Sequence, residues 1–290
     1  MTKASVLVVG GGTMGRGIAG VCALAGYDTM VFEADPAARE RLLPEIRASW
    51  QRAVASRKLD EGMVLEATKR LRTVGTIEEG CAATYAVEAV FESLALKERI
   101  FGELDRLCPE ARLLGSNTSS LSVASIALAT SRPDRVIGLH FFNPVAVMPL
   151  IEIVYGPDTS PATIAVAEAF AKTLGKKTVR VKDAPGFATS RLGVALGLEA
   201  MRMVEEGIAS AADIDRAMEL GYGHRMGPLK TTDLVGLDVR LSIAEALAAG
   251  LDPVRFAPPR ILRDYVAQGY LGKKAGRGFY VWEGDEAKNQ

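Results

Sequence analysis

Two side chains capable of proton transfer stand in neighbouring apolar segments. His140 lies near the end of RVIGLHF, and Glu152 interrupts PLIEIVY twelve residues later. A carboxylate inside a buried strand is costly unless it has a partner, and a histidine can supply one. The carboxylate would raise the basicity of the imidazole and fix its tautomer. We therefore predict a His140–Glu152 general base, although a histidine in an apolar strand is also typical of an ordinary core residue.

A second group of polar side chains follows another apolar segment. The turn SNTSSLS covers residues 116–122. Its hydroxyl and amide groups suit the capping of a following helix. Open α/β sheets also bind ligands at the carboxyl ends of their strands, where this turn would lie. One of its serines can therefore hold a substrate hydroxyl or carbonyl oxygen.

A glycine-rich turn near the N-terminus has the spacing of a dinucleotide site. Gly10, Gly12 and Gly15 form G-x-G-x-x-G between the apolar run SVLVV and a helical segment. The first glycine allows a tight turn, the second a close approach of a pyrophosphate, and the third close packing of helix and strand. The helix N-terminus adds N–H groups and partial positive charge, so we assign Thr13 and Met14 to the same site.

The expected cofactor is NAD. Glu33 directly follows the strand-like TMVF, where a carboxylate accepts both ribose hydroxyls and repels a 2′-phosphate. Asp35, two residues further on, competes for this role. A hydride acceptor beside a histidine base suits the oxidation of an alcohol.

Alternating short apolar runs and longer amphipathic runs position these residues. They predict α/β topology: a Rossmann-type, doubly wound parallel sheet in residues 1–184, followed by an all-helical C-terminal domain in residues 185–290. The expected strands are 5–9, 29–32, 71–74, 86–91, 111–115, 135–141, 150–155 and 177–181. The expected helices between them are 13–25, 36–58, 61–70, 95–107, 121–129 and 160–174. The C-terminal tail reads as a glycine-rich loop and one short aromatic strand.

The composition argues against a nucleic acid, a metal ion or a membrane as a partner. The 35 basic and 35 acidic residues among 290 give no net charge, so a nucleic-acid partner is not expected. The three cysteines, at 22, 81 and 108, have no metal-binding or disulfide spacing, and we expect no metal. No apolar run approaches the roughly 20 residues of a membrane span, and no leader sequence is visible. We expect a cytoplasmic protein that has no membrane contact.

Seven motifs in order resemble the short-chain L-3-hydroxyacyl-CoA dehydrogenases, including 3-hydroxybutyryl-CoA dehydrogenases. They run from residue 3 to about 282: VGGGTMGRGIA, VEAVFESLALKERIFGELD, SNTSSLS, GLHFFNPVAVMPLIEIV, DAPGFATSR, MGPLKTTDLVGLD and GYLGKKAGRGFY. The resemblance implies NAD-dependent, reversible oxidation of an L-3-hydroxyacyl thioester. It also implies a homodimer built by the helical domain, and a site between the two domains.

The resemblance also implies roles for individual residues. His140 matches the catalytic base, Glu152 the carboxylate that orients it, and Ser119 the serine that binds the 3-oxygen of the substrate. Asn143 falls near cofactor and substrate, and Ser49 on the substrate side. Three further residues are expected at the cofactor: Glu92, Lys97 and Asn117.

Two positions depart from the family pattern, both on the substrate side. Ser190 replaces an asparagine that helps to hold substrate in catalysis, and serine offers one donor where asparagine offers two. Ser56 replaces a lysine that meets coenzyme A. Arg52, Arg57 and Lys58 are nearby cations that could replace the missing lysine, although none occupies the same position in the family pattern.

These departures keep alternatives open. The same chemistry on a thioester of an acyl carrier protein, as in glyceryl-carrier oxidation for polyketide extender units, would make a nucleotide-binding lysine dispensable. The β-hydroxyacid dehydrogenases share the GGGTMG turn but use a helical lysine that GYGHRMGPLK does not provide. A non-catalytic NAD-binding protein is the remaining alternative, against which the buried Glu152 argues.

Overall fold

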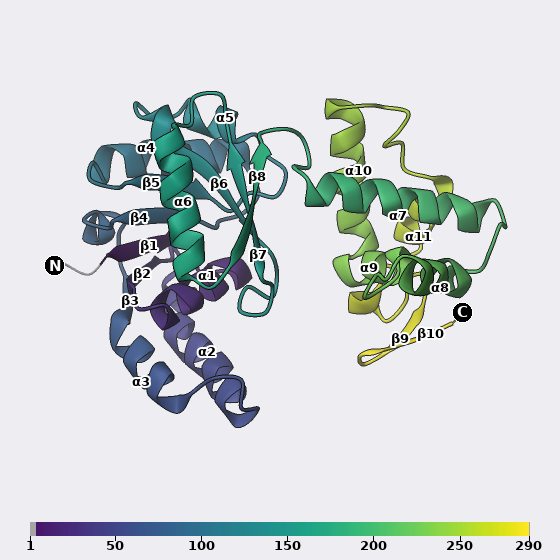
Figure 1. The fold of residues 1–290 in the computed structure, drawn as a ribbon, viewed down its shortest axis with the longest axis horizontal. Coiled ribbons are helices and arrows are strands. Elements are labelled where there is room, and N and C mark those ends of the chain that lie inside the picture. The colour runs from purple at the N-terminus through teal and green to yellow at the C-terminus, as the bar shows by residue number, and fades with distance from the viewer. Residues whose placement is uncertain (1–3, 290) are drawn as a thin grey trace. The chain divides into compact units, whose positions relative to one another are not determined.

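The computed structural model describes residues 4–289, and the chain divides into two compact units, Met1–Ala184 and Pro185–Gln290. Figure 1 shows a sheet with helices on both faces in the first unit and a group of helices in the second. No helix in the described range is both long and apolar enough to cross a bilayer.

The first unit is organised by an eight-stranded sheet in the order β3-β2-β1-β4-β5-β6-β7-β8. Neighbouring strands are parallel except β6 and β7, which are antiparallel. The strands are β1 Ser5–Val9, β2 Asp28–Phe32, β3 Leu71–Val74, β4 Tyr85–Glu88, β5 Leu113–Ser116, β6 Val136–Phe141, β7 Leu150–Tyr155 and β8 Lys177–Lys182. The doubly wound topology predicted from the alternating pattern is confirmed, and each expected strand exists.

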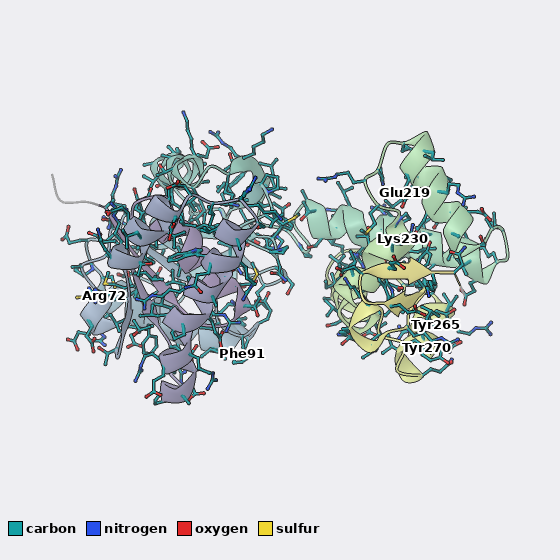
Figure 2. The ribbon with its side chains drawn as sticks, turned by 90° about the horizontal axis from the view of Figure 1, so that it is seen from below. Arg72, Phe91, Glu219, Lys230, Tyr265 and Tyr270 are labelled. Carbon is teal, nitrogen blue, oxygen red and sulfur yellow. The ribbon has the colours of Figure 1, made fainter. Side chains whose placement is uncertain are left out.

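One expected strand is shorter than its apolar pattern. The run 86–91 was expected to be extended throughout, but β4 ends at Glu88. The backbone turns there because the Glu88 carboxylate accepts a hydrogen bond from Val90 N at 2.7 Å. Phe91, in the loop that follows, is 87% exposed instead of buried in the sheet (Figure 2).

Capping side chains start most helices of the first unit. Asp35, Asp60, Ser122 and Ser160 each accept a hydrogen bond from a backbone N–H in the first turn, as N-cap residues do. The helices are α1 Thr13–Leu24, α2 Pro36–Ala55, α3 Glu61–Arg70, α4 Leu94–Leu107, α5 Val123–Ala127 and α6 Pro161–Thr173. Val6 and Val8 of β1 share one buried cluster with Ile18 of α1 and Phe170 of α6. This packing fixes the glycine turn against the sheet.

The second unit is helical, as predicted, and it ends in a short β-hairpin. Its helices are α7 Thr189–Glu205, α8 Ala211–Gly221, α9 Pro228–Val235, α10 Leu237–Gly250 and α11 Arg260–Ala267. The run 231–250, which reads as one helix, is two helices, because Gly236 has a φ of 101° that a helix cannot contain. The tail forms a two-stranded hairpin, β9 Val281–Glu283 and β10 Glu286–Lys288, where one strand was expected.

Two buried carboxylates hold the core of this unit together. Asp233 accepts hydrogen bonds from Phe279 N at 2.8 Å and from Trp282 Nε1 at 2.8 Å, which fixes the start of the tail on α9. Asp215 accepts from Leu229 N at 2.8 Å and from Tyr280 Oη at 2.7 Å. Nearer the surface, the ammonium of Lys230 lies 3.4 Å from the Glu219 carboxylate, and the rings of Tyr265 and Tyr270 meet edge to face (Figure 2). Asp215 and Asp233 therefore hold the aromatic tail by hydrogen bonds, although both lie far from it in the sequence.

Candidate active site

The packing of the chain itself requires two glycines of the turn. Gly10 has a φ of 106°, and a Cβ there would lie 2.6 Å from the carbonyl oxygen of Ala89. A Cβ on Gly15 would lie 1.9 Å from the carbonyl oxygen of Gly10. Any side chain at either position would displace backbone, so these glycines let α1 start directly against the end of β1.

Gly12 is different, because a Cβ there would meet no protein atom within 4 Å. The residue is the N-cap of α1, and no side chain caps that helix. Thr13 and Met14 follow in the first turn, whose N–H groups and partial positive charge suit an anion. Since nothing in the chain demands a glycine here, the open space fits the pyrophosphate of a dinucleotide.

The two acidic candidates after β2 have separate places. Glu33 Oε2 accepts from Gly11 N at 2.7 Å, so its carboxylate lies against the glycine turn. Asp35 instead accepts from Ala37 N at 3.0 Å and caps α2. A carboxylate has four acceptor sites, so Glu33 can bind ribose hydroxyls while it holds the turn.

His140 and Glu152 face each other across the antiparallel pair of strands. They are direct partners in the β6–β7 register, where side chains of opposed residues lie on the same face. His140 Nδ1 lies 2.7 Å from Glu152 Oε2. The Glu152 side chain is fully buried, and His140 is 7% exposed. The arrangement can hold an imidazolium next to a carboxylate and fixes the ring by its Nδ1.

The serine turn is organised by Glu92. Its Oε1 accepts from Thr118 Oγ1 at 2.7 Å, from Ser119 N at 3.0 Å and from Ser120 N at 3.1 Å. Burial raises the pKa of Glu92, but these hydrogen bonds and the nearby Lys97 ammonium lower it overall. The loop that carries Ser119 is thus fixed by a carboxylate that remains ionised.

Lys97 is buried between two carboxylates. Its Nζ lies 2.6 Å from Glu88 Oε1 and 3.3 Å from Glu92 Oε2, and its side chain is 1% exposed. Glu88, which is fully buried, also accepts from Ser116 Oγ at 2.7 Å. Sequence reasoning missed Glu88, although the signal that identified Glu152, a glutamate inside an apolar strand, is equally present in AVEAVF.

Two asparagines lie at the same edge of the sheet. Asn117 Oδ1 accepts from Phe141 N at 3.0 Å and ties the end of β5 to the residue after His140. Asn143 is exposed and precedes Pro144 through a cis peptide bond. The connection between β6 and β7 that contains Asn143 is held by Lys176, whose Nζ donates to Val145 O at 2.6 Å.

The remaining predicted residues belong to helices α2 and α7. Ser49 is exposed on α2, and Ser56 is the C-cap of that helix, where its hydroxyl donates to Arg52 O at 3.0 Å. Ser190 lies in the first turn of α7, in the second unit, and is half-buried. Within residues 4–289, no group of acidic, cysteine and histidine side chains could hold a metal ion.

Both units match the same family of known proteins. Residues 5–184 match the family described as "3-hydroxyacyl-CoA dehydrogenase, NAD binding domain", and residues 186–282 match its "C-terminal domain". A probable 3-hydroxybutyryl-CoA dehydrogenase of Bacillus subtilis is 42% identical, covering 96% of this chain and 97% of the relative. A 3-hydroxybutyryl-CoA dehydrogenase of Mycobacterium tuberculosis is 44% identical over 95% of this chain and 97% of the relative. The crystal structure of (S)-3-hydroxybutyryl-CoA dehydrogenase PaaH1 from Ralstonia eutropha superposes with a TM-score of 0.92 at 38% identity, over 97% of this chain and 100% of that one.

The chain therefore belongs to the 3-hydroxyacyl-CoA dehydrogenase family. It is an NAD-dependent oxidoreductase, as predicted. This membership sets aside the β-hydroxyacid dehydrogenases and the non-catalytic NAD-binding protein as alternatives.

Proposed function

We propose that this member of the family interconverts an L-3-hydroxyacyl thioester and the 3-ketoacyl thioester, with 3-hydroxybutyryl-CoA as the reference substrate. The observation that carries the proposal is the buried 2.7 Å contact between His140 Nδ1 and Glu152 Oε2. It lies at the edge of the sheet where β5 and β6 end, in the unit that carries the glycine turn. The similarity to a probable 3-hydroxybutyryl-CoA dehydrogenase and to a 3-hydroxybutyryl-CoA dehydrogenase supports it.

The chemistry follows from the fixed imidazole. Because Nδ1 is held by Glu152, Nε2 is the nitrogen that takes the proton of the substrate 3-hydroxyl. The Glu152 carboxylate stabilises the imidazolium that forms. Bound NAD supplies the acceptor for the hydride that leaves C3. In the reverse direction, His140 returns the proton to the 3-oxygen.

The remaining residues orient the substrate. Ser119 donates its hydroxyl to the 3-oxygen, and Glu92 keeps that serine in place through the Ser119 N–H at 3.0 Å. We assign further substrate contacts to Asn143, Ser190 and Ser49. A small set of preorganised polar groups of this kind places the 3-oxygen within reach of the base.

Oxidation of NADH by acetoacetyl-CoA, followed by absorbance, tests the assignment. The expected result is rapid turnover by the wild type and a loss of at least about a hundredfold in kcat for Glu152→Gln, since the imidazolium loses its counter-charge. Gly12→Ala is expected to fold normally and to bind NADH more weakly, because only the ligand occupies the space beside it. Near-normal turnover by Glu152→Gln would refute the proposed base.

A thioester of an acyl carrier protein remains the second candidate. Its supporting observation is Ser56, whose hydroxyl is bound to helix carbonyls and offers no cation for a nucleotide phosphate. A matched ketoacyl group presented on coenzyme A and on a carrier protein separates the two. Fast turnover of the ketoacyl-CoA supports the first candidate. Turnover of only the ketoacyl group on the carrier protein supports the second.

We also propose that the helical unit forms a homodimer, and that the protein acts in the cytoplasm. Large apolar side chains are exposed on three helices of this unit, at Leu192 and Leu196 of α7, Leu234 and Val235 of α9, and Val239 of α10. Exposed large apolar side chains are typical of subunit interfaces where they gather into a patch. Light scattering after gel filtration gives the mass, and a monomer at micromolar concentration would contradict the dimer.

A further inference from the structure

The loop between β4 and α4 presents an aromatic ring to solvent. Its residue Phe91 is 87% exposed, the highest fraction among the exposed large apolar side chains of residues 4–289 (Figure 2). A ring of this size stabilises a complex strongly when a ligand removes it from water. The neighbours of Phe91 in the first unit indicate which ligand that is.

The residues on either side of Phe91 are both fixed. Before it, Val90 packs against the glycine turn so closely that a Cβ on Gly10 would lie 3.1 Å from Val90 Cγ1. After it, Glu92 Oε1 accepts a hydrogen bond from Ser119 N at 3.0 Å. Phe91 therefore lies between the glycine turn and the serine turn, on a backbone that is anchored to both.

The strand order places this loop under the path of the cofactor. Doubly wound sheets bind a dinucleotide where the strand order reverses, which here is between β1 and β4. Glu33, after β2, is the residue for the adenosine ribose, and His140, near the end of β6, must lie close to the carbon that gives its hydride to the nicotinamide. The cofactor must then extend from β2 past β4 towards β6, and neighbouring strands are about 4.8 Å apart. This step rests on the proposed function, because it uses His140 as the base.

We propose that the ring of Phe91 contacts the nicotinamide ring of the bound cofactor and favours its oxidised form. The nicotinamide of NAD⁺ is a cationic pyridinium, whereas that of NADH is neutral. The face of an aromatic ring attracts a cation in addition to the ordinary contact between two rings. Phe91 is thus a positioning residue that also sets how strongly the protein distinguishes NAD⁺ from NADH.

The test measures cofactor binding in the absence of any thioester. The fluorescence of bound NADH gives its Kd, and displacement of NADH gives the Kd of NAD⁺. Phe91→Leu, which stays apolar but has no aromatic face, is expected to raise the Kd of NAD⁺ about tenfold and that of NADH about threefold. The ratio of the two Kd values then rises about threefold. Phe91→Tyr, which keeps the aromatic face, is expected to leave the ratio within about twofold of the wild type.

Two controls separate the nicotinamide contact from other effects. ADP-ribose, which has every part of the cofactor except the nicotinamide ring, is expected to bind the wild type and Phe91→Leu equally well. Leu128→Ala changes another exposed apolar side chain of the same unit, 84% exposed at the C-cap of α5. It is expected to leave all three Kd values unchanged.

Each outcome decides the inference. Unchanged Kd values in Phe91→Leu, or an equal loss for NAD⁺ and NADH, would overturn it. An equal loss for ADP-ribose would also overturn it, because the ring would then act on the rest of the cofactor or on the loop. A wild type that binds NADH but does not reduce acetoacetyl-CoA overturns the proposed function instead, and the binding measurements register that failure separately.

Discussion

Buried charge is handled in opposite ways in two regions of this molecule. At the edge of the sheet, Glu88, Lys97 and Glu152 are all buried, and each contacts an oppositely charged or titratable group within 2.7 Å. Between α7 and α10, Arg240 is buried with no such group. The first region is complete in the protein alone and can hold a reactive geometry without a ligand. The second leaves a buried guanidinium nitrogen and a neighbouring threonine hydroxyl without hydrogen-bond partners.

The largest expected effect comes from the completed region. His140→Ala is expected to lower kcat by about a hundredfold to ten-thousandfold, because the proton of the 3-hydroxyl loses its acceptor, while NADH binding persists. His224→Ala is the matched control, since His224 is the other histidine and is exposed. Stopped-flow kinetics and NADH fluorescence measure the two quantities. Equal losses in both variants would mean that His140 has no special role.

Removal of the buried cation beside the serine turn should be nearly as costly, but to stability. Lys97→Met leaves Glu88 and Glu92 facing each other without compensation and is expected to destabilise the unit by about 3–5 kcal/mol. Arg99→Met, on the exposed side of the same helix, is expected to change the free energy of unfolding by less than about 0.5 kcal/mol. Urea unfolding measures both. A mild effect of Lys97→Met would remove the contrast between the two regions.

The contribution of Glu92 should depend on pH. Its pKa is lowered in the folded protein, so the ionised carboxylate stabilises the fold above the unfolded-state pKa of about 4.3. This stabilisation is lost as the pH falls through the folded-state pKa. The difference in unfolding free energy between wild type and Glu92→Gln should therefore be largest at neutral pH and shrink in acid. Urea titrations at a series of pH values would show it, and a difference independent of pH would contradict it.

The smallest expected effect comes from the incomplete region. Arg240→Met removes an uncompensated buried charge and keeps most of the side-chain volume, so stability should change by no more than about 1 kcal/mol and can increase. Thermal unfolding of the ligand-free protein measures it. A loss as large as that of Lys97→Met would show that Arg240 has a partner in the protein and would erase the comparison.

The elements and the proposed dyad were accessible from sequence because their signals are local. The glycine spacing, the acidic residue after β2 and the alternation of strands and helices depend on neighbours in the chain. The opposition of His140 and Glu152 needed only the assumption that a buried glutamate seeks a partner. The structure pairs them directly.

What sequence reasoning missed depends on contacts between distant residues. Glu92 reaches a turn 26 residues away, and Asp233 reaches the tail 46 residues away, so neither link has a local pattern. The separation of α9 from α10 depends on the positive φ of Gly236, which a glycine permits but does not require. Arg240 reads as an ordinary polar position on an amphipathic helix, and only the packing under Gly193 and Gly197 shows that it is enclosed.

The antiparallel pairing of β6 and β7 also bears on the order of folding. It joins residues close in sequence, with His140 opposite Glu152, whereas the parallel pairing at the cofactor side joins Val6 to Tyr85. Closing a short loop costs less chain entropy than closing a long one, and contacts of low sequence separation form faster. The contact between His140 and Glu152 can therefore form within a single local hairpin, while the pairing of β1 with β4 requires strands that lie far apart in the chain.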